Sequence, residues 1–237
     1  MGNVIKINGD QVELHEYSNI ITRNSRFRTT AVTRLLYGSG YLPLKRLIDI
    51  LFSLLMLPPV ALIIILCATL IKLDSRGPIF YLQERTGKGG RRFKMYKLRT
   101  MVENAEILKN NYSSLNTQTY PDFKIPNDPR ITKIGGILRK TSLDEIPQFF
   151  NVLKGDMSIV GPRPTSFPAS TYNLWHTARL EIKPGITGLW QVSGRSDIDF
   201  DDRNRLDIAY WRNFSLWLDL KIIFLTFSSV FNGRGAE

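Results

Sequence analysis

The feature that most constrains this 237-residue chain is a long apolar segment interrupted by two adjacent prolines. Between Leu47 and Ile71 the only charged residue is Asp49. As one helix these residues would measure ~37 Å, more than the ~30 Å hydrocarbon core of a bilayer. The segment is therefore a membrane candidate by length and composition. The open question is whether it crosses the bilayer or turns back within it.

The Pro58–Pro59 pair favours a turn over a simple crossing. Proline has no N–H and disfavours helical geometry in the residue before it. A single proline is tolerated in membrane helices, but two together predict a sharp break. The break would leave two arms of about a dozen residues each, neither long enough to span the bilayer.

Positive charges flank the segment at both ends. The flanking residues are Lys45 and Arg46 before it, and Lys72 and Arg76 after it. Because Lys and Arg tend to stay on the cytoplasmic side, a segment that enters and returns satisfies both flanks. Asp49 follows Lys45 by four residues and Arg46 by three, so we expect it to pair with them near the interface. A kinked span and a buried core helix are the alternatives to this re-entrant interpretation, which places everything after Lys72 in the cytoplasm.

The chain is strongly basic, with 32 Lys and Arg against 21 Asp and Glu and a net charge of +11. Such a surplus predicts an anionic partner: nucleic acid, acidic lipid or a phosphorylated small molecule. A single cysteine, Cys67, excludes an internal disulfide framework and a zinc cluster built on cysteines.

A predicted β-hairpin over residues 77–101 concentrates part of this charge. Its basic residues are Arg85, Lys88, Arg91, Arg92, Lys94, Lys97 and Arg99. These side chains could lie on anionic headgroups, hold a phosphate, or simply face solvent.

Two adjacent acids, Asp144 and Glu145, open a segment with helical periodicity. Its apolar residues, at i, i+3, i+4 and i+7, are Ile146, Phe149, Phe150 and Leu153. Ser142 and Glu145 have the spacing of a capping box, and Gly155 is placed to end the helix. One interpretation is therefore structural, with Glu145 closing the box and Asp144 favoured by the positive helix end.

A functional interpretation stands beside it because Pro147 disrupts the turn that carries both acids. Violations of local rules are commoner at functional sites. A helix N-terminus also binds phosphates. Phosphates beside two carboxylates would need cations, such as Mg²⁺ and arginine. Arg139 and Arg163 are nearby in sequence, and Arg163 lies in a stiff Pro-Arg-Pro segment suited to a bidentate phosphate contact.

The order of these motifs resembles the bacterial sugar transferase family, the monotopic polyprenyl-phosphate phosphoglycosyltransferases. The matching stretches are LKRLIDI (44–50), IKLDSRGPIFYLQERTGKGG (71–90), FKMYKLRTM (93–101), NDPRITKIGGILRKTSLDEIPQFFNVLKGDMSIVGPRP (127–164), RLEIKPGITGLWQVSGR (179–195) and LDIAYWRNFSLWLDLKIIFLT (206–226). The acidic helix followed by G-D-M-S-x-V-G-P-R-P is the most specific of them. The re-entrant hairpin is also a family property, although the family more often breaks it with Ser-Pro about one turn after Pro58–Pro59.

The resemblance implies a ping-pong reaction in which Asp144 attacks the β-phosphate of a UDP-sugar and releases UMP. A polyprenyl phosphate, such as undecaprenyl phosphate, would then accept the phosphosugar from the aspartyl intermediate. Glu145 would complete the dyad, and both carboxylates would bind Mg²⁺. The residues assigned to phosphate or nucleotide binding are Arg139, Arg163, Lys97 and Arg99.

Together these features predict an α+β fold: a mostly helical cytoplasmic domain with a small β-hairpin, attached by a re-entrant helix-break-helix and interfacial amphipathic helices. The expected divisions are an extension and linker over 1–43, with a linker at 37–41, the membrane hairpin over 44–72 and the catalytic domain over 73–237. The C-terminal segment 216–231 could lie at the membrane interface or pack on the domain.

The implied partners are a UDP-sugar, polyprenyl phosphate and membrane lipid, with no nucleic acid, and a homodimer is left open. The enzyme would begin surface-glycan assembly (exopolysaccharide, capsule, O-antigen or glycoprotein) at the inner face of the bacterial cytoplasmic membrane. Two alternatives differ in class. One is a non-catalytic, basic, membrane-attached module that binds lipid or nucleic acid, and the other is a glycosyltransferase that releases UDP.

Overall fold

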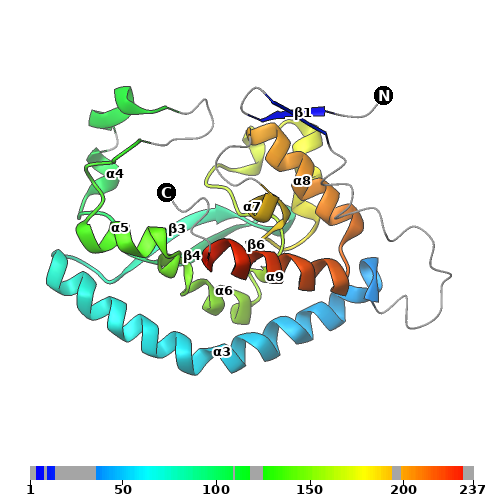
Figure 1. The fold of residues 1–237 in the computed structure, drawn as a ribbon, viewed down its shortest axis with the longest axis horizontal. Helices are drawn as coiled ribbons and strands as arrows, with labels where there is room; N and C mark the ends of the chain where they lie inside the picture. The colour runs from blue at the N-terminus through cyan, green and yellow to red at the C-terminus, as the bar shows by residue number, and fades with distance from the viewer. Residues whose placement is uncertain are drawn as a thin grey trace.

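The structure, a computed structural model, describes residues 4–7, 10–13, 36–108, 110–117, 125–193 and 199–231. It is mostly helical with short strand pairs, as the sequence predicts (Figure 1). The helices are α3 (Gly38–Asp74), α4 (Ala105–Leu108), α5 (Lys133–Lys140), α6 (Gln148–Lys154), α7 (Leu189–Ser193), α8 (Phe200–Asn213) and α9 (Leu216–Phe231). The strands are β1 (Val4–Ile7), β2 (Asp10–Glu13), β3 (Phe80–Thr86), β4 (Arg92–Leu98), β5 (Ser158–Val160) and β6 (Gly185–Thr187). Short 3₁₀ turns cover Lys88–Gly90, Asn110–Leu115, Leu143–Glu145, Ala169–Thr171 and Leu174–Glu181.

The strands form three separate pairs. β1 pairs with β2 and β3 with β4, both antiparallel, whereas β5 and β6 are parallel. The β3–β4 pair is the predicted hairpin, and its register runs from Phe80 opposite Leu98 to Thr86 opposite Arg92. The turn between these strands contains Gly89 and Gly90 at positive φ, a backbone conformation that glycine adopts without steric cost.

The predicted break at the two prolines is wrong, because α3 remains helical from Gly38 through Pro58 and Pro59 to Asp74. The helix is bowed rather than interrupted (Figure 1). A helix can bend at proline instead of ending there, and buried residues on both sides of the pair, Ser53 and Val60, hold both halves against the domain. The helix also begins inside the predicted linker at 37–41.

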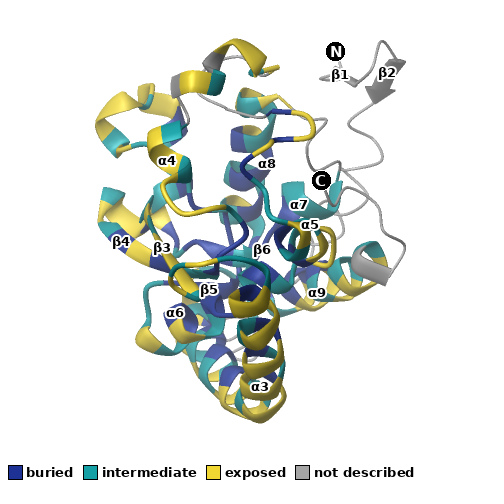
Figure 2. Ribbon diagram, turned by 90° about the vertical axis from the view of Figure 1, so that its left-hand side faces the viewer, coloured by how far each residue is buried: buried dark blue, intermediate teal, exposed yellow. Residues whose placement is uncertain are grey.

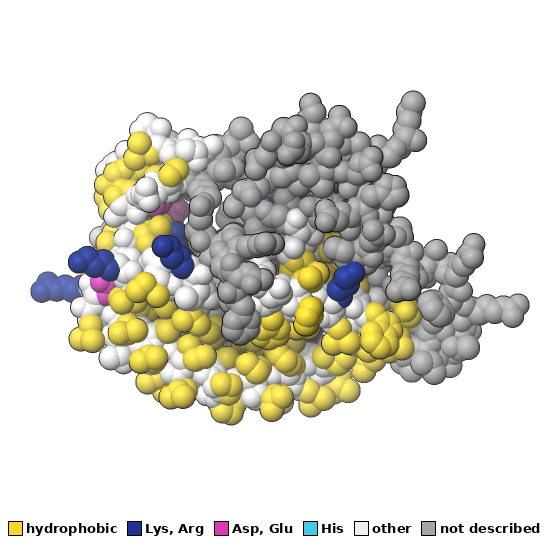
Figure 3. All heavy atoms as spheres, viewed as in Figure 1, with side chains coloured by type: hydrophobic (Ala, Val, Ile, Leu, Met, Phe, Trp, Pro, Cys, Tyr) yellow, Lys and Arg dark blue, Asp and Glu magenta, His cyan; other side chains and the backbone are white. Residues whose placement is uncertain are grey.

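One face of α3 is buried along its whole length. Its buried residues, mostly spaced three or four apart, are Tyr41, Lys45, Asp49, Ser53, Val60, Ile64, Cys67 and Ile71. They contact α6, β5 and α5, and Figure 2 shows the helix lying below the other elements. The opposite face is apolar and exposed, with Leu55 72% and Leu73 80% exposed. Apolar side chains accordingly gather along the lower edge of the molecule in Figure 3.

The polar start of α3 binds other elements instead of pairing within the helix. Lys45 forms an ion pair with Asp219 of α9, 2.5 Å from Nζ to Oδ2. Arg46 donates to the last carbonyls of α6, and Asp49 accepts the N–H of Ile159 at 3.0 Å. The direct contacts of Lys45 and Arg46 are therefore not the predicted ones with Asp49, although the Lys45 charge is close enough to act on Asp49. Because this stretch is packed against the domain, buried partners from distant segments replace its neighbours on the helix.

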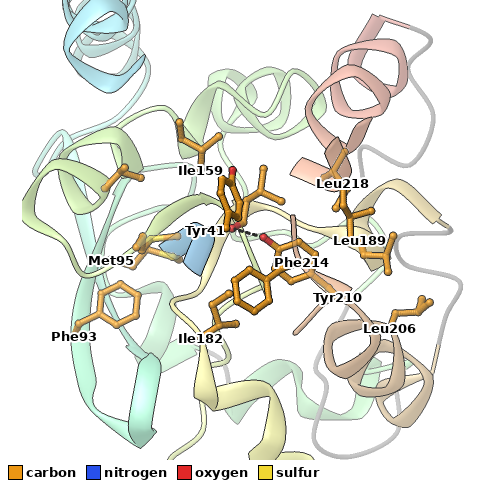
Figure 4. Packing of buried hydrophobic residues seen from close by; sticks show 14 residues of the cluster. Tyr41, Phe93, Met95, Ile159, Ile182, Leu189, Leu206, Tyr210, Phe214 and Leu218 are labelled. Carbon is orange, nitrogen blue, oxygen red and sulfur yellow. Dashed lines mark hydrogen bonds between the residues drawn. The ribbon is translucent and has the colours of Figure 1, made fainter. Parts of the chain in front are cut away.

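The main hydrophobic core lies where α3, the β3–β4 hairpin, β5, α8 and α9 meet. Figure 4 shows Tyr41, Met95, Ile159, Tyr210 and Phe214 converging there. The tyrosine hydroxyls do not lie unpaired in this core, since Tyr41 and Tyr210 both donate to Asp219, at 3.0 and 2.6 Å.

The C-terminal helix α9 has one face in this core and one face exposed. Leu218 and Ile222 are buried, so the helix packs on the domain, one of the two alternatives for this segment. Its outer face is apolar as well, with Trp217 59% and Phe224 73% exposed. Interfacial contact through that face stays a prediction.

We expect α5 to tolerate alanine at Gly136 but not at Gly135. A Cβ on Gly135 would lie 2.0 Å from the Thr100 carbonyl oxygen, whereas a Cβ on Gly136 meets nothing within 4 Å. Gly135→Ala should lower the free energy of unfolding by about 1–3 kcal/mol through overpacking. Gly136→Ala should leave it unchanged or raise it by up to about 1 kcal/mol. Denaturant unfolding in detergent, followed by circular dichroism, measures both; equal effects would contradict the packing of α5 described above.

Candidate active site

The turn that carries Asp144 and Glu145 is not the predicted capping box. Ser142 has a left-handed backbone (φ 57°) and no side-chain capping bond, and a 3₁₀ turn over Leu143–Glu145 precedes α6. Pro147 does interrupt the segment, and α6 begins only after it. The Leu143 carbonyl is satisfied by the N–H of Ile146 at 3.3 Å. Glu145 is therefore free of a capping role, and its carboxylate is bound elsewhere.

Two cations hold the Glu145 carboxylate. Arg163 donates to both of its oxygens, with Nη1 3.0 Å from Oε2, and Lys97 Nζ lies 2.8 Å from Oε1. Burial alone would raise the pKa of Glu145, but the Arg163 and Lys97 charges and hydrogen bonds hold that pKa well below its usual value. Glu145 is thus an ionised anchor with both oxygens occupied.

Asp144 is buried beside it with far fewer contacts. Lys97 Nζ lies 3.5 Å from its Oδ2, and among the described residues Oδ1 has no hydrogen-bond partner. Burial raises the pKa of Asp144, Lys97 lowers it, and the neighbouring Glu145 charge raises it further. The two adjacent carboxylates are therefore unequal: one is fully engaged and the other has an oxygen available for chemistry.

Of the other two predicted phosphate-binding residues, the fold places one near the carboxylates and the other away from them. Arg139, in the last turn of α5, donates to the Thr100 hydroxyl at 2.9 Å, and its charge is near enough to lower the pKa of Asp144. Arg99 lies elsewhere, since it is buried and donates to Ser75 and Arg76 after the end of α3. Arg99 thus stabilises the α3 terminus, and its contacts are not with the carboxylates.

A buried ion pair between Arg179 and Asp207 supports the backbone of Arg163. Arg179 donates to the Arg163 carbonyl at 2.6 Å and pairs with Asp207 at 2.5 Å. Both side chains are almost fully buried. Sequence reasoning missed this pair, because Arg179 and Asp207 are 28 residues apart in the sequence. Nothing local in either segment marks them as partners of each other or as a support for the Pro-Arg-Pro backbone.

Sequence reasoning also missed the position of Arg85, which it treated only as one of seven basic hairpin residues. Arg85 lies close enough to Arg163 and Glu145 for their charges to alter its pKa. The strand register could have revealed this position, because it places Arg85 and Lys97 on the same face of the hairpin.

A divalent metal bound at this site would need additional ligands from a substrate. The described residues contain no group of three or more His, Cys, Asp or Glu side chains that could hold a metal ion. Mg²⁺ is commonly bound by one or two carboxylates together with substrate phosphates. The unbonded oxygen of Asp144 fits this pattern, and so does Oε2 of Glu145, which accepts from Arg163 Nη1 and has a second lone pair.

Comparison with known proteins identifies sequences that are similar to this chain. Residues 40–233 match the family described as bacterial sugar transferase. The chain is 42% identical over its whole length to a galactosyl transferase, CpsE, of Streptococcus agalactiae. It is 42% identical over 92% of its length to an undecaprenyl-phosphate galactose phosphotransferase of Salmonella typhimurium.

The length of the match differs between relatives. The chain spans about half the length of those two proteins, 53% and 44% respectively. The exopolysaccharide production protein ExoY of Sinorhizobium fredii is nearer in size, being 40% identical with 81% of this chain and 87% of that protein aligned. With the family match covering most of its residues and including Asp144, Glu145 and Arg163, this chain belongs to the bacterial sugar transferase family.

Proposed function

We propose that this protein transfers a sugar-1-phosphate from a UDP-sugar to a polyprenyl phosphate such as undecaprenyl phosphate, releasing UMP. The carrying observation is the unequal carboxylate pair among cations, with Asp144 open and Glu145 bound by Lys97 and Arg163. Names of family relatives support the substrates, since they include transferases of galactose phosphate and glucose-1-phosphate to undecaprenyl phosphate. The product would begin the assembly of a surface glycan such as exopolysaccharide, capsule, O-antigen or glycoprotein.

In the proposed first step, the open oxygen of Asp144 attacks the β-phosphorus of the donor. The bond from that phosphorus to the bridging oxygen breaks, and the oxygen leaves with UMP. In the second step a phosphate oxygen of the polyprenyl acceptor attacks the same phosphorus and releases the Asp144 carboxylate. Arg139, Arg163 and Lys97 stabilise negative charge on the transferring group. A Mg²⁺ ion bound by Asp144 and Glu145 with the phosphates would supply further charge neutralisation.

Asp144→Asn should reduce UMP release by about 10³-fold or more, because an amide oxygen is a poor nucleophile. The assay incubates the detergent-solubilised protein with Mg²⁺, polyprenyl phosphate and a panel of UDP-sugars. Asp201→Asn is the matched control, because Asp201 is exposed and pairs with His176 away from the site. UMP release that survives in Asp144→Asn would exclude Asp144 as the nucleophile.

The identity of the released nucleotide also distinguishes the proposed function from its two alternatives. UDP in place of UMP would indicate a glycosyltransferase that moves the sugar without its phosphate. No nucleotide product from any donor would favour the non-catalytic lipid- or nucleic-acid-binding module, whose affinity should then fall steeply with salt.

We expect activity to depend on a divalent cation. With EDTA in excess the rate of UMP release should fall by at least about tenfold, and Mg²⁺ should restore it, because the phosphate charges would otherwise be only partly neutralised. Parallel circular dichroism should show no change in folding, since the described fold contains no three-ligand metal cluster. A full rate in EDTA would exclude the proposed Mg²⁺ role.

We further propose that α3 enters the cytoplasmic leaflet and returns, keeping the domain at the inner face of the membrane. Helix α3 is long and apolar enough to cross a membrane. Both its ends bond to the same domain, however: Lys45 to Asp219, and Asp74, which accepts the N–H of Ile134 at 3.1 Å. A full crossing would require the packed domain to follow the helix into hydrocarbon, where its polar groups could not be satisfied. The exposed prolines then lie on the inserted, convex side.

Cysteine labelling tests this topology. In a Cys67→Ser background, Gly40→Cys and Arg76→Cys place one exposed thiol near each end of α3. A membrane-impermeant maleimide should label both in inverted vesicles and neither in intact spheroplasts. Labelling of one site from each side would demonstrate a crossing and overturn the re-entrant proposal.

A further inference from the structure

Arg85 faces the candidate site from strand β3. In an antiparallel pair, alternate residues of a strand and their direct cross-strand partners share one face. Gln83 and Arg85 lie opposite Met95 and Phe93, and Tyr81 lies opposite Lys97. All of them therefore share the face from which Lys97 reaches the two carboxylates.

The Arg85 guanidinium is held in place without being neutralised. Its Nε and Nη2 donate to Gln83 Oε1 at 3.1 and 2.6 Å, and Nη1 approaches the Pro164 carbonyl at 3.3 Å. Among the described residues no carboxylate forms an ion pair with it. Of the five guanidinium N–H groups, one on each terminal nitrogen remains available. These two donors can bind a phosphate oxyanion through charge-assisted hydrogen bonds.

The local charge also favours an anion at this position. Burial lowers the pKa of Arg85 to about 10, with the Arg163 charge lowering it and Glu145 opposing that effect. Two carboxylates thus lie among four cationic side chains. The cations are Lys97, Arg139, Arg163 and Arg85. Two positive charges are left over, which favours the binding of an anionic phosphate group here.

We propose that Arg85 binds a second phosphate, distinct from the one that Asp144 attacks, with Gln83 as its positioning residue. This assignment rests on the proposed function. The charge of Arg139 acts on Asp144, whereas Arg85 lies beside Arg163 and Glu145. The ligand is a phosphate oxyanion: either the phosphate that departs with UMP or the phosphate of the polyprenyl acceptor.

Equilibrium binding tests the proposal without relying on turnover. The probes are UMP, for the donor phosphate, and a short-chain polyprenyl phosphate, for the acceptor. Both are titrated into the full chain in detergent. Arg85→Gln should raise the Kd of one probe by about tenfold or more, the loss expected for a charge-assisted contact. Lys94→Gln is the control, because Lys94 belongs to the same hairpin but is exposed on its opposite face, across from Glu84.

A second variant separates charge from folding. Gln83→Glu retains an acceptor for Arg85 while neutralising its charge, so it should weaken the same probe in a folded protein. A rise in the UMP Kd assigns Arg85 to the donor, and a rise in the polyprenyl phosphate Kd assigns it to the acceptor. Kd values within about twofold of wild type for both probes in folded Arg85→Gln or Gln83→Glu would overturn the proposal, given that a tenfold loss is expected. A wild type that binds UMP but releases none from any UDP-sugar would instead contradict the proposed function.

Discussion

The arrangement of the helices depends on the hydrogen bonds and the ion pair that the Asp219 carboxylate forms. It accepts from Lys45 and Tyr41 of α3 and from Tyr210 of α8, while lying itself on α9. Only 4% of Asp219 is exposed. Removing one partner of a buried ion pair typically costs about 3–5 kcal/mol, because it leaves a charge unpaired. One side chain thus joins the apolar helix to the two C-terminal helices of the domain.

From this junction, hydrogen bonds continue toward the acidic pair. Asp49, one helical turn after Lys45, binds the N–H of Ile159 in β5, and the chain then runs directly into the Pro-Arg-Pro segment. Arg179 fixes the carbonyl of Arg163 from the other side. The cation that holds Glu145 is therefore positioned by buried polar contacts on both sides, and neither support comes from a residue near it in sequence.

How much the sequence revealed depended on how local each signal was. The β3–β4 hairpin was predictable, since alternation and a glycine turn act within a few residues, and the Asp144–Glu145 turn with Arg163 was recognisable from compact motifs. The proline pair misled because packing along one face of α3 outweighed a local helix-breaking preference. The partner of Asp49 was unpredictable, since Ile159 is 110 residues away and nothing local announces it.

The continuous packing of α3 against the domain has a mechanical consequence. A catalytic domain on a flexible stalk samples many heights and tilts above the surface that anchors it. Here helix α3 packs directly on the domain with no linker between them, because its buried residues run from Tyr41 at one end of the helix to Ile71 at the other. Any surface that holds α3 therefore fixes the height of the carboxylate pair. A lipid-borne phosphate would then meet the site by lateral diffusion, as a search in two dimensions.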